Sequence, residues 1–253
     1  MPPIFFHMAA ARDLRLRLAT SCVDDEAGAY YLGATTPDIR VLTRGDRRDT
    51  HYFDLDSFDH QDSVEAFFRD QRQLTEADSL DAQTAAFVAG YITHLVLDET
   101  YITTVYRPHF GQLSALGGDD SANMMDRLLQ YELDRQRRER GEAVAEIRSA
   151  LADCSLAVDV GFLDADTLRR WQQVAIDMTR HPPTWERFRN QGGRHLRQAW
   201  MEDPTAYERF LETIPELLER TIRHVSTAHV DAFLEQSHER ALRAVERYLG
   251  CAS

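Results

Sequence analysis

The chain has 253 residues, enough for one large domain or two small ones, with the 43% hydrophobic and 28% charged residues of an ordinary globular protein. Its formal net charge of −13 excludes nucleic-acid binding through a basic face, because proteins that bind in this way neutralise phosphates with lysine and arginine. All 29 basic residues are arginine, which excludes Schiff-base lysines and the phosphate-binding lysine of P-loops.

Helical periodicity dominates the chain. Ala9–Ser21 and Asp62–Leu74 predict amphipathic helices, and Asp81–Val105 predicts a long, largely buried helix that the segment Arg107-Pro108-His109-Phe110-Gly111 ends. Further helices are predicted at Asp120–Arg140, Glu142–Cys154, Asp164–Arg180, Pro183–Asn190, Pro204–Arg223 and Ala228–Leu249. No stretch combines sustained alternation with β-branched residues, so we predict an all-α fold.

The segment Gly33–Ser57 has little helical signal but gathers charged side chains and a histidine. A loop of that length within a compact domain is usually functional. Residues 1–111, which hold this segment and the ligand candidates described below, are expected to form a metal-binding helical core. Residues 112–253 are expected to form a helical C-terminal part packed on the same domain.

The start of the chain lacks a basic segment followed by a long apolar run, so no signal peptide is predicted. The longest apolar-rich run, Thr84 to Val96, is too short to span a bilayer, so no transmembrane segment is expected. We predict a cytoplasmic protein.

His94 and Asp98 are the first candidates for chemistry. They lie four residues apart on the predicted buried helix, so both side chains leave the same face. A buried carboxylate needs a cation, hydrogen bonds or a proton, and a divalent ion shared with His94 would satisfy both groups. Taken alone, however, the pair fits a hydrogen bond that locks helix packing better than it fits a metal site.

Three further residues make a metal site at His94 and Asp98 the better interpretation. His7 follows a short apolar segment and precedes a predicted helix, Asp38 follows a turn with glycine and proline, and His51 stands between aromatic residues. Together with His94 and Asp98 they form a set of nitrogen and carboxylate ligands. Such a set suits zinc, iron or manganese better than calcium or magnesium, and we expect one to two ions.

In this order, four elements resemble the zinc-dependent phospholipase C family: His7, Leu32-Gly33-Ala34-Thr35-Thr36-Pro37-Asp38, Thr50-His51 and Gly90-Tyr91-Ile92-Thr93-His94-Leu95-Val96-Leu97-Asp98. The grouping includes the N-terminal domain of glycosylphosphatidylinositol-specific phospholipase D and, more distantly, fungal single-strand nucleases. The resemblance covers roughly residues 4 to 111. As an ordered set it is far more specific than any one motif.

The resemblance implies an all-α phospholipase C/nuclease-like domain with a buried metal cleft. It implies a main ion held by Asp38, His51, His94 and Asp98, and a second ion held by His7 with Asp98 as the bridge. Zinc-rich relatives carry another histidine four or five residues after the helix aspartate, where this chain has Ile102 and Thr103. A third ion is therefore not expected.

Function follows from this site. We expect a metal-dependent phosphoester hydrolase whose metal-activated water attacks a small phosphodiester or phosphomonoester, with Asp38 or Asp98 assisting proton transfer. Arg40 and Arg44, near Asp38, would either clamp a phosphate or form plain ion pairs. The alternative function is a non-catalytic helical metal-binding scaffold derived from the same family. The sequence leaves the oligomeric state open.

Overall fold

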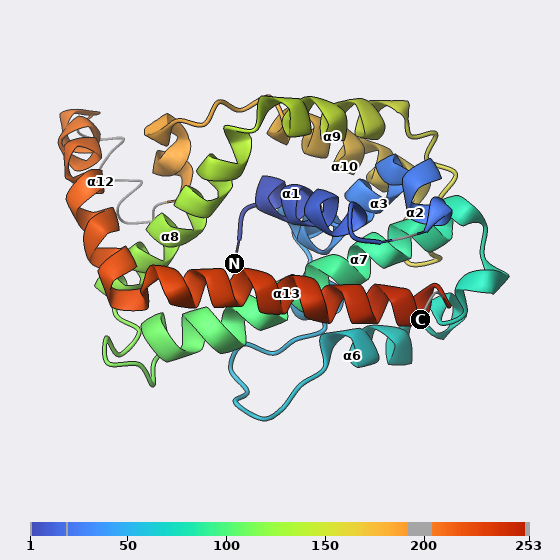
Figure 1. The fold of residues 1–253 in the computed structure, drawn as a ribbon, viewed down its shortest axis with the longest axis horizontal. Helices are drawn as coiled ribbons and strands as arrows, with labels where there is room; N and C mark the ends of the chain where they lie inside the picture. Colours follow the sequence, from blue (N-terminus) through green and yellow to red (C-terminus); the bar gives the residue numbers. More distant parts are fainter. Residues whose placement is uncertain (1, 19, 192–203, 251–253) are drawn as a thin grey trace. The chain divides into compact units, whose positions relative to one another are not determined.

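The computed structural model of the protein describes residues 2–18, 20–191 and 204–250, and the described residues contain helices but no β-strand (Figure 1). The all-α prediction is confirmed. None of the described helices is long and apolar enough to cross a membrane.

The helices of the first half are mostly short, apart from one long central helix. They are α1 (Ile4–Arg15), α2 (Ser21–Asp25), α3 (Ala27–Gly33), the 3-10 helix η1 (Thr36–Ile39), α4 (Arg40–Thr43), α5 (Arg48–His51), α6 (Ser63–Asp70), the 3-10 helices η2 (Arg72–Leu74) and η3 (Ala77–Ser79), α7 (Ala82–Tyr101) and the π-helix η4 (Ile102–Phe110).

The helices of the second half are longer, and most match the predicted ranges within a few residues. They are α8 (Asp120–Arg138), α9 (Gly141–Asp153), α10 (Ala165–Met178), the 3-10 helix η5 (Trp185–Gln191), α12 (Pro204–Val225) and α13 (Thr227–Tyr248).

Several predicted boundaries are wrong. Helix α1 begins at Ile4 rather than Ala9, because Phe5 and Phe6 are fully buried and give this segment an apolar face. It ends at Arg15 rather than Ser21, where α2 begins. The helix that was expected to end before Pro108 continues as a π-helix to Phe110. A π-helix bonds each N–H to a carbonyl five residues back, and the Gly111 N–H closes the last such turn on the Tyr106 carbonyl at 2.8 Å.

The chain folds into two compact units that alternate along the sequence. The first consists of Met1–Pro3, Thr100–Glu139 and Pro182–Glu235, and the second of Ile4–Glu99, Arg140–His181 and Gln236–Ser253. In the first unit α8 packs on α12 and on η4. Its small core includes Leu128, Tyr131, Phe188 and Ile214.

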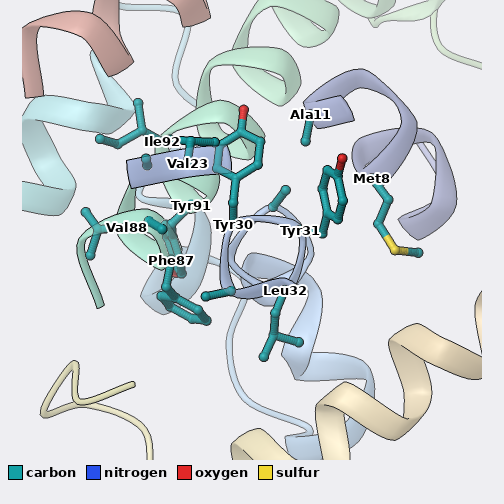
Figure 2. Packing of buried hydrophobic residues seen from close by; sticks show 14 of the residues in the cluster. Met8, Ala11, Val23, Tyr30, Tyr31, Leu32, Phe87, Val88, Tyr91 and Ile92 are labelled. Atoms are coloured by element: carbon teal, nitrogen blue, oxygen red, sulfur yellow. The ribbon is translucent and has the colours of Figure 1, made fainter. Parts of the chain in front are cut away.

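The second unit holds the main hydrophobic core. Helix α9 packs on α1, α3 and α10, and α3 also contacts α1. Figure 2 shows Tyr30, Tyr31 and Leu32 pointing outward from α3 among side chains of neighbouring helices, including Met8 and Phe87. These side chains are fully buried, so α3 is fixed on every side.

Two glycines allow α3 and α7 to touch backbone to backbone. A Cβ atom on Gly33 would lie 1.9 Å from the Phe87 carbonyl oxygen, and one on Gly90 would lie 1.9 Å from the Tyr30 carbonyl oxygen. Any larger residue at either position would push the helices apart. This close crossing fixes the segment after α3 against the middle of α7.

Candidate metal centre

Five predicted ligands come together in the second compact unit, although they lie far apart in the sequence. Helix α1 contributes His7, η1 contributes Asp38, α5 contributes His51, and α7 contributes His94 and Asp98. The histidines and Asp98 are buried, with at most 2% of each residue exposed. Asp38 keeps 15% of its side chain exposed and is the part of the cluster nearest to solvent.

Asp98 is the centre of the cluster. Its Oδ1 atom lies 3.4 Å from His7 Nε2, while its Oδ2 atom lies 3.4 Å from His51 Nε2 and 3.7 Å from His94 Nε2. His51 Nε2 is also 3.5 Å from Asp38 Oδ1. Asp98 therefore presents one carboxylate oxygen to His7 and the other to His51 and His94.

His94 is oriented by the close crossing of α3 and α7. Its Nδ1 atom donates to the carbonyl oxygen of Ala34 at 2.8 Å, since a carbonyl can only accept. The other ring nitrogen, Nε2, is therefore unprotonated in the neutral ring and directed at the carboxylates. A ligand histidine in a metal site is usually held in this way.

His51 is held through its neighbour Thr50. The Thr50 hydroxyl lies 3.0 Å from His51 Nδ1, and the Thr50 carbonyl accepts a 2.6 Å hydrogen bond from the Tyr91 hydroxyl. Tyr91 lies on α7, three residues before His94. The same helix that carries two of the predicted ligands therefore also fixes the short helix α5, which carries a third.

The cluster contains buried polar atoms with no hydrogen-bond partner in the described part of the chain. They are both ring nitrogens of His7, the Nε2 atoms of His51 and His94, and Asp98 Oδ1. Unsatisfied buried polar atoms are costly and rare, so several in one place indicate a missing partner.

Several separations between donors are those of ligands that share an ion. Zinc bonds of 2.0–2.2 Å place tetrahedral donors about 3.3 to 3.6 Å apart. The separations from His51 Nε2 to Asp38 Oδ1 and to Asp98 Oδ2 are 3.5 and 3.4 Å, and His94 Nε2 is 3.7 Å from that same Asp98 oxygen. Two groups of three ligand atoms each lie within 4.8 Å of one another, His7 with His94 and Asp98, and Asp38 with His51 and His94, so the residues match a divalent ion in donor type and His94 belongs to both groups.

The pKa shifts of four of the five residues also favour the metal-binding form, and the raised pKa of His94 is the exception. Burial alone would raise the carboxylate pKa values, but the neighbouring histidines lower the pKa of Asp38 to about 2 and hold that of Asp98 well below its usual range. Burial lowers the pKa of His51 to about 4 and also lowers the pKa of His7. For His94, burial is outweighed by Asp98, which raises its pKa. Ionised carboxylates and neutral imidazoles are the forms that bind metal.

Arg47 is a site residue that the sequence did not single out. Its Nη2 atom lies 3.2 Å from Asp98 Oδ2, and only 12% of its side chain is exposed. The arginines named from the sequence, Arg40 and Arg44, form no ion pair with the described residues, so the expected plain ion pairs are not seen. The one sequence feature that could have identified Arg47 as a site residue is its position one helical turn before His51.

The positions where zinc-rich relatives carry a further histidine hold no metal-binding side chain. Ile102 is buried and Thr103 is exposed, both in the π-helix η4. His109, further along η4, packs its ring on His224 and His229, with centroids 5.7 and 4.8 Å away. All these residues belong to the first compact unit, whereas the cluster belongs to the second.

Comparison with known proteins agrees with the sequence resemblance. The family described as zinc dependent phospholipase C matches residues 3–173, well beyond the Gly111 limit of the motifs. No curated protein and no solved structure matches the chain. Because the family match covers more than half of the chain, this protein belongs to the zinc-dependent phospholipase C family.

Proposed function

We propose that this protein is a metal-dependent phosphoester hydrolase whose active site is the buried cluster around Asp98. The observation that carries the proposal is the set of buried, unpartnered imidazole nitrogens of His51 and His94, which face two ionised carboxylates. Asp38, His51, His94 and Asp98 would hold the main ion, which we take to be zinc with iron or manganese as alternatives. His7 would hold a second ion together with Asp98, if one is present.

When bound, the ion would lower the pKa of a coordinated water and polarise a phosphoryl oxygen. The residues have distinct roles around it. Asp98 is buried and turns both oxygens toward histidines, so it holds the site together. Asp38 is ionised and partly exposed, so it is the carboxylate that a water molecule can reach and that would take a proton during hydrolysis.

The substrate class follows from charge and family. A chain of net charge −13 is unsuited to a polyanion such as nucleic acid, but a bound ion could still recruit a single phosphate. The family description names phospholipids. The cytoplasmic location predicted from the sequence favours a small soluble phosphodiester or phosphomonoester, so both kinds of ester belong in the assay.

The test compares zinc-loaded wild-type protein with Asp98→Asn, which keeps the shape of the side chain and removes its charge. We expect slow cleavage of an aryl phosphodiester by the wild type, lost on chelation and restored by zinc, and none above background by the variant. The panel includes aryl phosphomonoesters and short-chain phospholipids. Equal turnover of zinc-replete wild type and variant on every substrate would support the alternative, a metal-binding scaffold without catalysis.

A further inference from the structure

Arg47 is built into the cluster rather than left at the surface. It directly precedes α5, and its carbonyl accepts the His51 N–H at 2.9 Å, so its backbone is fixed to a predicted ligand. Its side chain is 12% exposed. The guanidinium donates to the Phe53 carbonyl at 3.1 Å and to Asp98 Oδ2 at 3.2 Å. One terminal nitrogen thus contacts a backbone carbonyl, and the other contacts the central carboxylate.

That carboxylate oxygen is the one shared by the main ligand group. Asp98 Oδ2 faces His51 and His94, whereas Oδ1 faces His7. Arg47 therefore adds a permanent positive charge at the edge of the proposed ion position. Arg40 and Arg44 form no ion pair with an acidic group among the described residues and Arg44 is exposed, so Arg47 is the arginine in this segment that contacts Asp98.

Charge balance limits what else the site can hold. Two carboxylates, one divalent ion and Arg47 leave the site with one net positive charge, which would attract a phosphate. A second divalent ion would raise the net charge to three in a buried place, where like charges repel strongly. In addition, the His7 side of Asp98 has few donors, because His94 would have to serve both ions.

We propose that Arg47 is the phosphate-binding cation of this site and that its positive charge substitutes for that of a second metal ion. This inference rests on the proposed function. The centre then holds one zinc. The guanidinium binds substrate phosphate through its charge and through N–H donation to phosphate oxygens. Arg47 is thereby a substrate-binding residue that a lysine would replace only in part.

The test uses the full chain as wild type, Arg47→Met, Arg47→Lys and the control Arg44→Met, all loaded with excess zinc and then desalted. Zinc content is measured by elemental analysis and inorganic phosphate affinity by calorimetry. Wild type and Arg44→Met should hold one zinc and bind phosphate equally. Arg47→Met should bind phosphate about tenfold or more weakly and should gain part of a second zinc.

Several results would overturn the inference. They are a wild type with two zinc ions, an Arg47→Met protein that binds phosphate as the wild type does, or a wild type that binds zinc but no phosphate. If Arg47→Met does not fold, Arg47→Lys decides: it should keep one zinc and bind phosphate several-fold more weakly, and unchanged affinity would contradict the role. A wild type without zinc would instead contradict the proposed function itself.

Discussion

The Nδ1 atom of His94 donates a 2.8 Å hydrogen bond to the carbonyl oxygen of Ala34, sixty residues earlier in the chain. This contact links packing to chemistry. It exists because Gly33 and Gly90 let α3 and α7 approach at backbone distance, and it leaves His94 Nε2 free to face Asp98. Fold stability and metal binding should therefore fail together when the crossing is disturbed.

Gly90→Ala tests that link. The added methyl group would overlap the Tyr30 carbonyl oxygen, which is backbone and cannot move aside cheaply. We expect the free energy of unfolding to fall by at least about 2 kcal/mol and zinc affinity to fall with it. The control is Gly141→Ala, where nothing lies within 4 Å of the new Cβ atom and the change should be neutral or slightly stabilising. A Gly90→Ala protein with unchanged stability and zinc affinity would show that neither depends on the close crossing of α3 and α7.

Metal removal should lower thermal stability. An ion that binds only the folded chain stabilises it by about 4 kcal/mol at a thousandfold excess over its Kd, which for a chain of this size corresponds to a shift on the order of 10 °C. We expect Tm to fall after chelation and to recover when zinc is added back, as followed by circular dichroism at 222 nm. An unchanged Tm in both steps would show that the cluster holds no ion.

His94→Ala should lose zinc. The substitution removes a buried donor that faces both Asp98 and the His51 ring, and we expect zinc affinity to fall by about 100-fold or more. His238→Ala is the matched control, because His238 is also buried and lies on α13, outside the ligand groups. Competition with a chromophoric chelator measures both affinities. Equal losses in the two variants would mean that the ion binds elsewhere.

The metal-free protein should lose stability on mild acidification. The folded-state pKa of His51, about 4, lies below its ordinary value of 6.5 because burial disfavours the imidazolium. Between these values the unfolded chain binds the extra proton, so unfolding becomes easier as pH falls from about 6.5 toward 4. His51 alone would account for about 2 kcal/mol between pH 7.5 and pH 5.

Urea unfolding of metal-free wild type and His51→Gln at pH 7.5 and pH 5 measures this effect. The variant is less stable at both pH values for other reasons, so the quantity of interest is the difference between the two pH values. That difference should be smaller in the variant. An identical decrease in both proteins would show that His51 is already protonated when folded or does not contribute.

The sequence was informative wherever residue type dictates environment. His94 and Asp98 were predicted to share a buried face because helical spacing and apolar neighbours leave no other arrangement, and the structure puts both on the buried part of α7. The helices of the second half were predicted closely because each carries an apolar stripe. The ordered motifs also led to the family, which the match over residues 3–173 confirms.

Other features depended on tertiary contacts that no local pattern encodes. Arg47 is one of several arginines in a polar loop, and only the fold directs it at Asp98. The early start of α1 follows from burial of Phe5 and Phe6 by distant helices. Proline is known to end α-helices, so Pro108 predicted the end of the helix. It gave no indication of a π-helix that continues to Phe110.

Zinc-edge anomalous diffraction from crystals of the zinc-loaded full chain would show whether a metal centre lies around Asp98. We expect a peak within bonding distance, about 2.0 to 2.2 Å, of Asp38, His51, His94 and Asp98. A zinc-loaded crystal with no peak among these side chains, or with its only peak at other residues, would contradict it.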